Sequence, residues 1–260
     1  MTTLLEKTRR VNRLLQRQAG KAVDFGEMAA VLSDVIKANI YIVDSSGLVL
    51  GYALIAQFEC PIVKEGVLGD GRFPPDYSQK LLRIDETSAN IAQEGRRCVF
   101  KKDENCTYGE KLTTIVPMTG GGQRLGTLIL ARFGEEFAAD DLILAEYAAT
   151  SVAMEMLRVR SERVETEVRQ KAAVQVAIGS LSYSELEAIQ HVFKEMTGLE
   201  GFLVASRIAD RVGITRSVIV NALRKFEGAG VIESRSLGMK GTYIKVLNGM
   251  LLEELKRLRG

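Results

Sequence analysis

The sequence lacks any apolar run that approaches the roughly 18 residues a membrane-spanning helix needs. Its first segment, MTTLLEKTRRVNRLLQRQ, alternates apolar and basic residues at helical spacing and has no apolar signal-peptide core. Histidine occurs once, as His191 in an amphipathic helix, and neither a metal-type spacing of His, Asp and Glu nor a G-x-S-x-G motif is present. We therefore predict a cytoplasmic protein that is not an enzyme and requires no cofactor, and we assign no catalytic or metal-binding residue.

Cysteine is also scarce, and its three residues all lie in the first half of the chain: Cys60, Cys98 and Cys106. An odd number in a cytoplasmic chain argues against a disulfide framework. Three thiolates from one pocket could bind zinc or an iron–sulfur centre with a fourth ligand, or sense oxidation. The simpler interpretation is three independent small side chains, because no C-x-x-C spacing supports a metal site.

The net charge of the 260 residues is only +2, but the charge is unevenly distributed. Length predicts about two domains, and a composition of 46% hydrophobic and 26% charged residues is that of ordinary globular proteins. Residues 201–246 contain eight basic residues against three acidic ones. A basic segment on a nearly neutral protein is what a phosphate-facing surface needs, although a solvated charged face would look similar.

The first half predicts an α+β domain. Residues 1–37 have helical spacing, with a second helix starting behind Asp24. NIYIVDSSGLVLGYAL (39–54) and TTIVPMTGGGQRLGTLILARF (113–133) each read as a β-hairpin around a Ser/Gly turn, separated by an irregular stretch at 56–112. Helices beside an antiparallel sheet with a long excursion between hairpins suit a small-molecule sensor domain of the GAF or PAS kind.

The run GGGQRLG (120–126) could be a phosphate-binding loop or a turn. A dinucleotide fingerprint opens a helix, and a P-loop places Lys and Ser or Thr after its last glycine. Here a strand pattern follows, with Thr127 directly after Gly126. The run therefore predicts a hairpin turn.

Residues 140–178 contain no Gly or Pro and predict one long helix. Its second half is rich in charges, which predicts a solvent-exposed connector. Apolar residues recur in alternating steps of three and four along a seam, which commonly packs on a partner helix and makes a dimer plausible. The seam positions are 142, 145, 149, 152, 156 and 159.

The C-terminal part has the pattern of a winged helix-turn-helix. Ser184 and Glu187 fit a capping box, which predicts that a helix begins there. We expect a helix at 203–211, a turn at Gly213 and Ile214, and a second helix from Thr215 to about Gly228, followed by two strands around the loop LGMKG.

In such a fold the leading end of the second helix enters a DNA groove, and a basic wing contacts the backbone. The alternative is a winged helix that is used only for protein contacts. The residues that we predict to contact DNA are Ala209, Thr215, Arg216, Ser217, Asn221, Lys225, Arg235 and Lys240.

Several motifs together resemble the CodY family of nutrient-responsive transcriptional regulators. They include LSYSELEAI, LVASRIADRVGITRSVIVNALRK and AGVIESRSLGMKGTYIKV in the second half, and TTIVP, GGGQRLGTLIL and DDLILAEYAAT before it. The resemblance covers nearly the whole chain and is looser between 44 and 110. It implies a GAF-like effector-binding domain at 1–138, a long linker helix at 139–180 and a winged helix-turn-helix at 181–260. It also implies a homodimer that represses genes at an A/T-rich inverted repeat.

The resemblance further implies isoleucine or another branched-chain amino acid as effector, with GTP as a second one. Carried over by position, the effector-binding residues would be Ile62, Val63, Arg72, Phe73, Pro74, Tyr77, Cys98 and Phe100. The nucleotide-binding residues would be Val23, Phe25, Asp44, Ser45, Ser46, Glu155 and Arg160.

Two departures from the family pattern bear on these effectors. Ile62 stands near the position of the family's pocket arginine, which would hold the carboxylate of the ligand. Either Arg72 or Lys64 takes over this role, or the protein binds a different ligand. We therefore predict weaker isoleucine binding than is typical of the family. The family's Ser-Arg-Arg turn corresponds to Asp44, Ser45 and Ser46, which is a poor triphosphate site, so we do not expect GTP sensing. A redox- or metal-responsive regulator that uses the three cysteines is the alternative.

Overall fold

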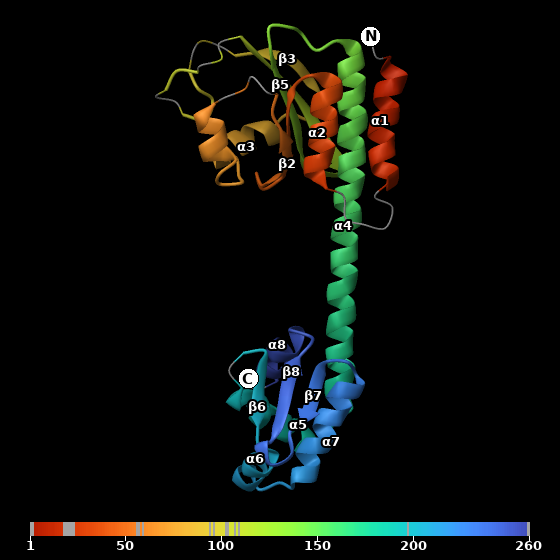
Figure 1. Cartoon of the computed structure of the whole chain (residues 1–260), viewed down its shortest axis with the longest axis vertical. Helices are drawn as coiled ribbons and strands as arrows, with labels where there is room; N and C mark the ends of the chain where they lie inside the picture. The colour runs from red at the N-terminus through yellow and green to blue at the C-terminus, as the bar shows by residue number, and fades with distance from the viewer. Residues whose placement is uncertain are drawn as a thin grey trace. The chain divides into compact units, whose positions relative to one another are not determined.

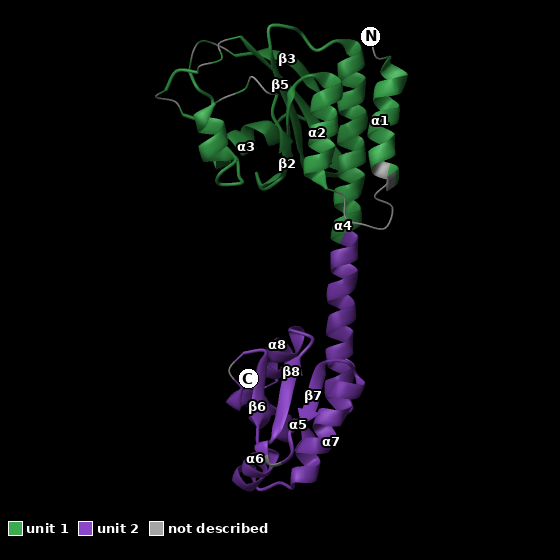
Figure 2. Cartoon of the chain, in the orientation of Figure 1, with its two compact units in different colours: residues 1–160 green, residues 161–260 purple. Residues whose placement is uncertain are grey.

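The computed structural model of this chain divides into two compact units, residues 1–160 and residues 161–260 (Figure 2). Each unit has a hydrophobic core of its own. The structure describes residues 3–17, 24–55, 58, 60–93, 95, 97–101, 104–106, 108, 110–196 and 198–258.

Unit 1 is an antiparallel five-stranded sheet with helical segments on both faces (Figure 1). The strands lie in the order β2-β1-β5-β4-β3. Their bounds are β1 Asn39–Asp44, β2 Val49–Ala53, β3 Ser88–Ala92, β4 Lys111–Gly120 and β5 Gln123–Phe133. The helical segments are α1 Leu4–Arg17, α2 Phe25–Ile36, the π-helical η1 Ile62–Val67, α3 Pro75–Leu82 and the part of α4 Ala139–Gly179 up to residue 160.

The two faces of this sheet carry separate cores, because successive strand residues point to opposite sides. Ile40 and Ile42 of β1 belong to a core with α1, α2 and the first turns of α4. Tyr41 and Val43 belong to the other core, which contains several aromatic side chains and residues of η1 and α3. The α+β fold predicted from the sequence is therefore confirmed, and the second, aromatic face holds an outer pocket and a deeper cavity.

Both predicted hairpins are present, and local turn chemistry explains them. The Oδ1 atom of Asp44 accepts a hydrogen bond from the backbone N–H of Ser46 at 2.8 Å, and Gly47 has a left-handed φ of +87°. Gly121 and Gly122 have φ values of +57° and +73° between β4 and β5. The GGGQRLG run is thus a hairpin turn, as predicted.

The described part of the stretch between the hairpins contains one strand that the sequence did not predict. In β3, Ile91 lies opposite Thr113 and Ala92 opposite Leu112 of β4. The residues SANIA have no alternating apolar pattern, so the strand exists because the edge of β4 offers it hydrogen-bond partners.

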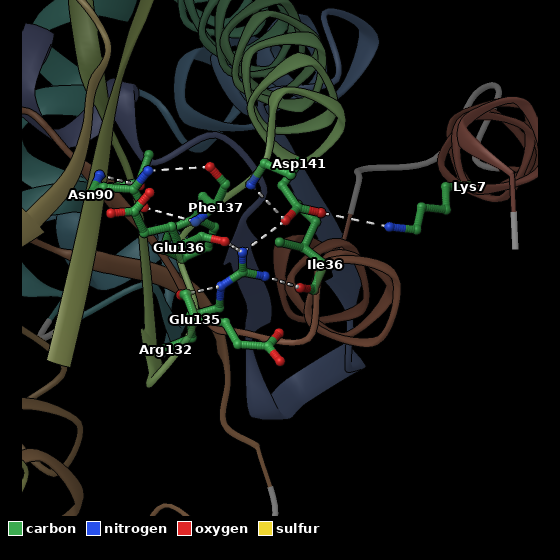
Figure 3. A network of polar contacts seen from close by, with 10 residues as sticks. Lys7, Ile36, Asn90, Arg132, Glu135, Glu136, Phe137 and Asp141 are labelled. Carbon is green, nitrogen blue, oxygen red and sulfur yellow. Dashed lines mark hydrogen bonds and ion pairs between the residues drawn. The ribbon is translucent and has the colours of Figure 1, made fainter. Parts of the chain in front are cut away.

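A buried arginine fastens the N-terminal end of α4 to the sheet (Figure 3). The guanidinium of Arg132, near the end of β5, pairs with Asp141 Oδ2 at 3.0 Å. It also donates to the carbonyl oxygens of Ile36 at 3.2 Å and Glu135 at 3.0 Å. The other carboxylate oxygen of Asp141 lies 3.6 Å from Lys7 Nζ. One ionic cluster thus joins α1, α2, β5 and α4.

Helix α4 confirms the predicted long helix, but its apolar seam packs differently from the prediction. The seam positions up to residue 156 lie in or against the first core of unit 1, and Ala145, Ala149 and Val152 are fully buried there. The chain's own α1, α2 and sheet cover them, so the inference of a partner helix on this seam was wrong. Residues 159–172 are exposed, as predicted. Among the described residues, no helix is both long and apolar enough to cross a membrane.

Unit 2 contains the end of α4, four further helices and a three-stranded antiparallel sheet in the order β6-β8-β7. The helices are α5 Tyr183–Glu195, α6 Ala205–Val212, α7 Arg216–Gly228 and α8 Met250–Arg257. The strands are β6 Glu200–Leu203, β7 Ile232–Ser236 and β8 Thr242–Val246, with the 3-10 turn η2 Gly238–Lys240 between the last two.

Helix α5 begins after Ser182, not at Ser184 as predicted. The Oγ of Ser182 accepts from the N–H of Glu185 at 3.3 Å, and Glu185 Oε2 accepts from the N–H of Ser182 at 2.7 Å. The sequence fits the S-x-x-E capping box twice, at 182–185 and at 184–187. Only the earlier register lets Glu185 also pair with Lys225 of α7, at 2.7 Å.

The first helix of the helix-turn-helix also starts later than predicted. Leu203 lies opposite Thr242 in the β6–β8 pairing, so the chain is extended up to this residue. α6 therefore begins at Ala205 and not at residue 203.

Candidate functional site

The turn between α6 and α7 has helix-turn-helix geometry. Gly213 takes a left-handed φ of +75°, and its N–H donates to the carbonyl oxygen of Ala209 at 2.9 Å. Ala209 is only 3% exposed and packs in the core of unit 2 with Ile219 and Leu223. A small residue is needed at this helix contact, so Ala209 lies inside the fold and supports the turn between the two helices.

The leading turn and one face of α7 are exposed. Thr215 stands at the N-cap, and its Oγ1 is 2.8 Å from Ser217 Oγ. The first N–H groups of a helix have no partners within it, so this end attracts anions. Arg216 is exposed in the first turn, and Ser217, Asn221 and Arg224 are exposed along one face at spacings of four and three residues. The sequence prediction omitted Arg224, which its position seven residues after Ser217 would have identified.

Lys225, which we predicted to contact DNA, has internal partners. Its Nζ donates to Glu185 Oε2 at 2.7 Å and to the carbonyl oxygen of Ser180 at 2.9 Å. The hydrogen bond from Lys225 holds the pKa of Glu185 below its usual value, and the N–H of Ser182 adds to this effect. Lys225 therefore ties α7 to the start of α5, and a phosphate contact would require it to leave this carboxylate.

The β7–β8 hairpin forms the predicted wing. Gly241 at its end has a φ of +103°, and a Cβ there would lie 2.3 Å from the carbonyl oxygen of Leu203, so only glycine fits. Lys240 at the tip is exposed. Arg235 is exposed too, although its Nη2 lies 2.6 Å from Glu233 Oε1 in a pair that water weakens.

The aromatic face of the unit 1 sheet has an open pocket of about 600 Å³. Arg72 lines it, but the guanidinium donates to the carbonyl oxygen of Ser46 at 2.7 Å and is thus engaged with the β1–β2 turn. The other predicted effector-binding residues that line this pocket are Ile62, Phe73, Pro74 and Phe100. Its remaining charged residues are Glu65, Asp70, Lys101 and Glu104.

A smaller cavity of about 40 Å³ lies deeper on the same face. Phe73 and Phe100 line both spaces, with ring centroids 5.7 Å apart and planes inclined by 8°. Val63 and Tyr77 line only the deeper one of these two, and burial raises the pKa of Tyr77 to about 12. Cys98 is buried but lines neither space.

Sequence reasoning missed the polar residues of this inner cavity, which are Asn39, Tyr41, Lys111 and Thr113. Burial raises the pKa of Tyr41, which is only 6% exposed. Asn39 and Lys111 are the first residues of β1 and β4, where a polar residue ahead of an apolar strand is a weak signal. The sequence does not show which strands pair, so it could not show that both residues reach one cavity.

In the predicted nucleotide-binding turn, the carboxylate of Asp44 accepts hydrogen bonds from the turn itself. Oδ1 of Asp44 accepts from both the N–H and the Oγ of Ser46, each at 2.8 Å. Ser45 is exposed, and its N–H donates to the carbonyl oxygen of Leu125. A carboxylate that stabilises the turn repels a triphosphate at the same position.

The other nucleotide-binding predictions line neither pocket. Phe25 is partly buried, Arg160 is exposed, and Glu155 accepts a hydrogen bond from Arg158 Nε at 2.8 Å. Val23 lies outside the described residues.

The cysteines do not support the redox or metal alternative. Cys98 is buried and its N–H donates to the carbonyl oxygen of Glu104, whereas Cys60 and Cys106 are partly exposed. In the part of the chain that the structure describes, no group of three His, Cys, Asp or Glu side chains is placed to hold a metal ion.

Comparison with known proteins covers both units. A family model described as the CodY GAF-like domain matches residues 3–180, and one described as the CodY helix-turn-helix domain matches residues 199–259. The global transcriptional regulator CodY of Clostridium perfringens strain SM101 is 59% identical over 259 residues, covering 100% of both chains. That of Clostridium botulinum strain Alaska E43 is 57% identical over the same length, with the same coverage.

Among solved structures, the cofactor-binding GAF domain of the nutrient sensor CodY from Clostridium difficile is 38% identical. It covers 60% of this chain and 99% of its own, with a TM-score of 0.44. The family models and the full-length relatives agree on both units, and the resemblance noted from the sequence motifs is confirmed.

Proposed function

Because the chain belongs to the CodY family of global transcriptional regulators, we propose that α7 and the wing bind operator DNA and that a small molecule in unit 1 controls the affinity. The sensor would occupy residues 1–138, the connecting helix 139–180 and the DNA-binding domain 181–260. The chain would act in the cytoplasm, mainly as a repressor, without catalysing a reaction.

The exposed face of α7 is the observation that carries the DNA-binding proposal. Arg216 and Ser217 stand at a helix end whose N–H groups attract phosphate, and Asn221 and Arg224 continue the same surface. Thr215 positions Ser217, while Arg235 and Lys240 place positive charge on the wing. The proposed operator is an A/T-rich inverted repeat.

Replacement of Arg216 by alanine is expected to weaken specific DNA binding by about 1–3 kcal/mol, because it removes a forked donor from the leading turn of the recognition helix. The measurement is a fluorescence-anisotropy titration of the full chain with an A/T-rich inverted-repeat duplex and with a random duplex of equal length. Arg216→Lys should retain part of the affinity, since it keeps the charge but not the planar fork.

Arg163→Ala is the matched control, because Arg163 is an exposed arginine of α4 whose guanidinium pairs with Glu167 at 3.1 Å, away from α7 and the wing. Its operator affinity should equal that of the wild type. An Arg216→Ala protein that keeps full preference for the inverted repeat would refute the assignment.

The proposed effector is a branched-chain amino acid, mainly isoleucine. The inner cavity of unit 1 supports this choice because most of its lining is aromatic or apolar and its polar groups lie together at one end. GTP forms no part of the proposal, since the Asp44 turn offers a carboxylate in place of cations.

We also propose a homodimer, supported by a second apolar stripe on α4. Ile143, Tyr147, Met154, Val164 and Val168 are all exposed, and their intervals of four, seven, ten and four residues keep them on one side of the helix. This stripe lies on the face of α4 nearly opposite the buried seam. Unpaired apolar stripes of this kind mark protein contacts, and a second copy of the same helix is the complementary occupant.

Met154→Glu and Val168→Glu, at residues that are 60% and 62% exposed, should each shift the chain toward monomer in sedimentation equilibrium, because a charge would enter an apolar interface. Val159→Glu is the control, since Val159 is 37% exposed but lies on the side of α4 opposite this stripe. Equal dissociation constants for all three variants and the wild type would exclude this interface.

A further inference from the structure

The inner cavity of unit 1 has one polar end built from two strands. Asn39 of β1 and Thr113 of β4 both lie opposite Ala131 of the central strand β5. Lys111 is two residues before Thr113 and so points to the same face of the sheet. All four residues line the cavity, whose remaining lining is apolar or aromatic.

Asn39 at this end is fully buried and has an unused donor. Its Oδ1 accepts from the N–H of Ile55 at 2.8 Å, which fixes the orientation of the amide. Its Nδ2 has no hydrogen-bond partner among the described residues. A buried donor left unpaired is costly, so a donor kept in a cavity wall points to an acceptor that arrives with a ligand.

Lys111 supplies a positive charge to the lining of the same cavity. It is partly buried and makes no ion pair or side-chain hydrogen bond with any other described residue. The cations of the outer pocket are already engaged, since Arg72 donates to Ser46 and Lys101 pairs with Glu104 at 3.0 Å. The outer pocket also carries three carboxylates, which disfavour an anion there.

We propose that Asn39 Nδ2 and Lys111 Nζ bind the carboxylate of an amino-acid effector at this inner end, in place of an arginine near Ile62. This inference rests on the proposed effector function and names the groups that recognise the ligand. The side chain of the ligand would lie against Phe58, Phe73 and Phe100. A charge-assisted bond in a dry site is strong, which compensates for the absent forked donor.

The inner cavity must enlarge before it can hold the proposed ligand. A space of about 40 Å³ holds little more than one water molecule, so a branched amino acid does not fit without a change. Phe73 and Phe100 stand between the inner cavity and the outer pocket and line both. Displacement of this stacked pair would join the two spaces and admit the ligand.

The test is isothermal titration of the full chain with L-isoleucine and with L-isoleucinol, which keeps the side chain and the ammonium group but lacks the carboxylate. The wild type should prefer isoleucine. Lys111→Met and Asn39→Asp should each weaken isoleucine binding by about ten-fold or more and reduce the preference over isoleucinol. Asn39→Asp keeps the acceptor for Ile55, and Lys111→Met alters a partly exposed side chain, so thermal melts can show that both variants fold.

Arg72→Met and Lys101→Met are the matched controls, and both should keep the preference for isoleucine. Loss of the preference in Arg72→Met, together with its retention in Lys111→Met and Asn39→Asp, would overturn the inner carboxylate site while leaving the effector function intact. Failure of the wild type to bind isoleucine, leucine or valine would instead overturn the proposed effector.

Discussion

Replacement of Arg132 by methionine is expected to lower the free energy of unfolding of unit 1 by about 3–5 kcal/mol, because it breaks a buried ion pair and leaves one partner without compensation. Arg132 is buried against Asp141 and the backbone carbonyl oxygens at the end of α2 and in the β5–α4 loop. Its guanidinium also lies 4.2 Å from the ring centre of Phe137. Methionine fills similar volume but can donate none of these hydrogen bonds.

Amide hydrogen exchange of the full chain, followed by peptide, measures this effect. Exchange should rise in peptides of α1, α2, β5 and the first turns of α4, and should stay at the wild-type level in unit 2. The double variant Arg132→Met/Asp141→Leu should recover part of the loss, since it removes the orphaned carboxylate as well. Arg163→Met, at an exposed ion pair of α4, should change stability little. Unchanged exchange in Arg132→Met would show that the cluster does not hold α4 to the sheet.

Replacement of Phe226 by alanine should have an effect of the same size in unit 2, about 3–5 kcal/mol, because it removes a large buried ring and leaves a cavity. Phe226 is 0% exposed, and its ring centre lies 6.4 Å from that of Phe193 on α5. It anchors α7 from the face opposite Ser217, Asn221 and Arg224. Its loss should therefore also reduce DNA binding, through unfolding of the recognition helix and not through a lost contact.

Urea denaturation, with exchange in α7 peptides as the local probe, measures this second effect. Phe202→Ala is the control, since Phe202 is 69% exposed on β6 and should cost far less stability. Low temperature separates the two causes of lost DNA binding, because the Phe226→Ala protein should regain affinity where it is folded, whereas Arg216→Ala should not. A Phe226→Ala protein as stable as Phe202→Ala would contradict the packing described for α7.

Helix caps and glycine turns were predicted correctly from the sequence, because their hydrogen bonds join residues only a few positions apart. Asp24 accepts from the N–H of Gly26 at 2.8 Å and starts α2 where the sequence predicted it. Gly213 and the Gly121–Gly122 pair take left-handed backbone that most other residues resist. The hairpins, the long α4 and the exposed leading turn of α7 follow from such signals and from apolar spacing.

The predictions failed where a sequence pattern occurs twice, or where an element depends on contacts with a distant segment. Ser182 and Ser184 fit the same capping pattern, and the contact of Glu185 with Lys225 distinguishes them. Strand β3 has no pattern of its own and exists through its pairing with β4. Both α4 stripes have the spacing of an interface, and packing on α1, α2 and the sheet decides which one is buried.

The sequence by itself determined the order of the elements, the helix-turn-helix and the family, because these depend on short-range periodicity, turn chemistry and motif identity. Only the tertiary structure decided that Lys225 holds α5, that Ala209 is buried and that Asn39 and Lys111 line one cavity from strands on either side of β5. The physical reason is that burial and pairing depend on which distant segments touch, and residues 72 positions apart reach the same cavity only when the strands adopt their register.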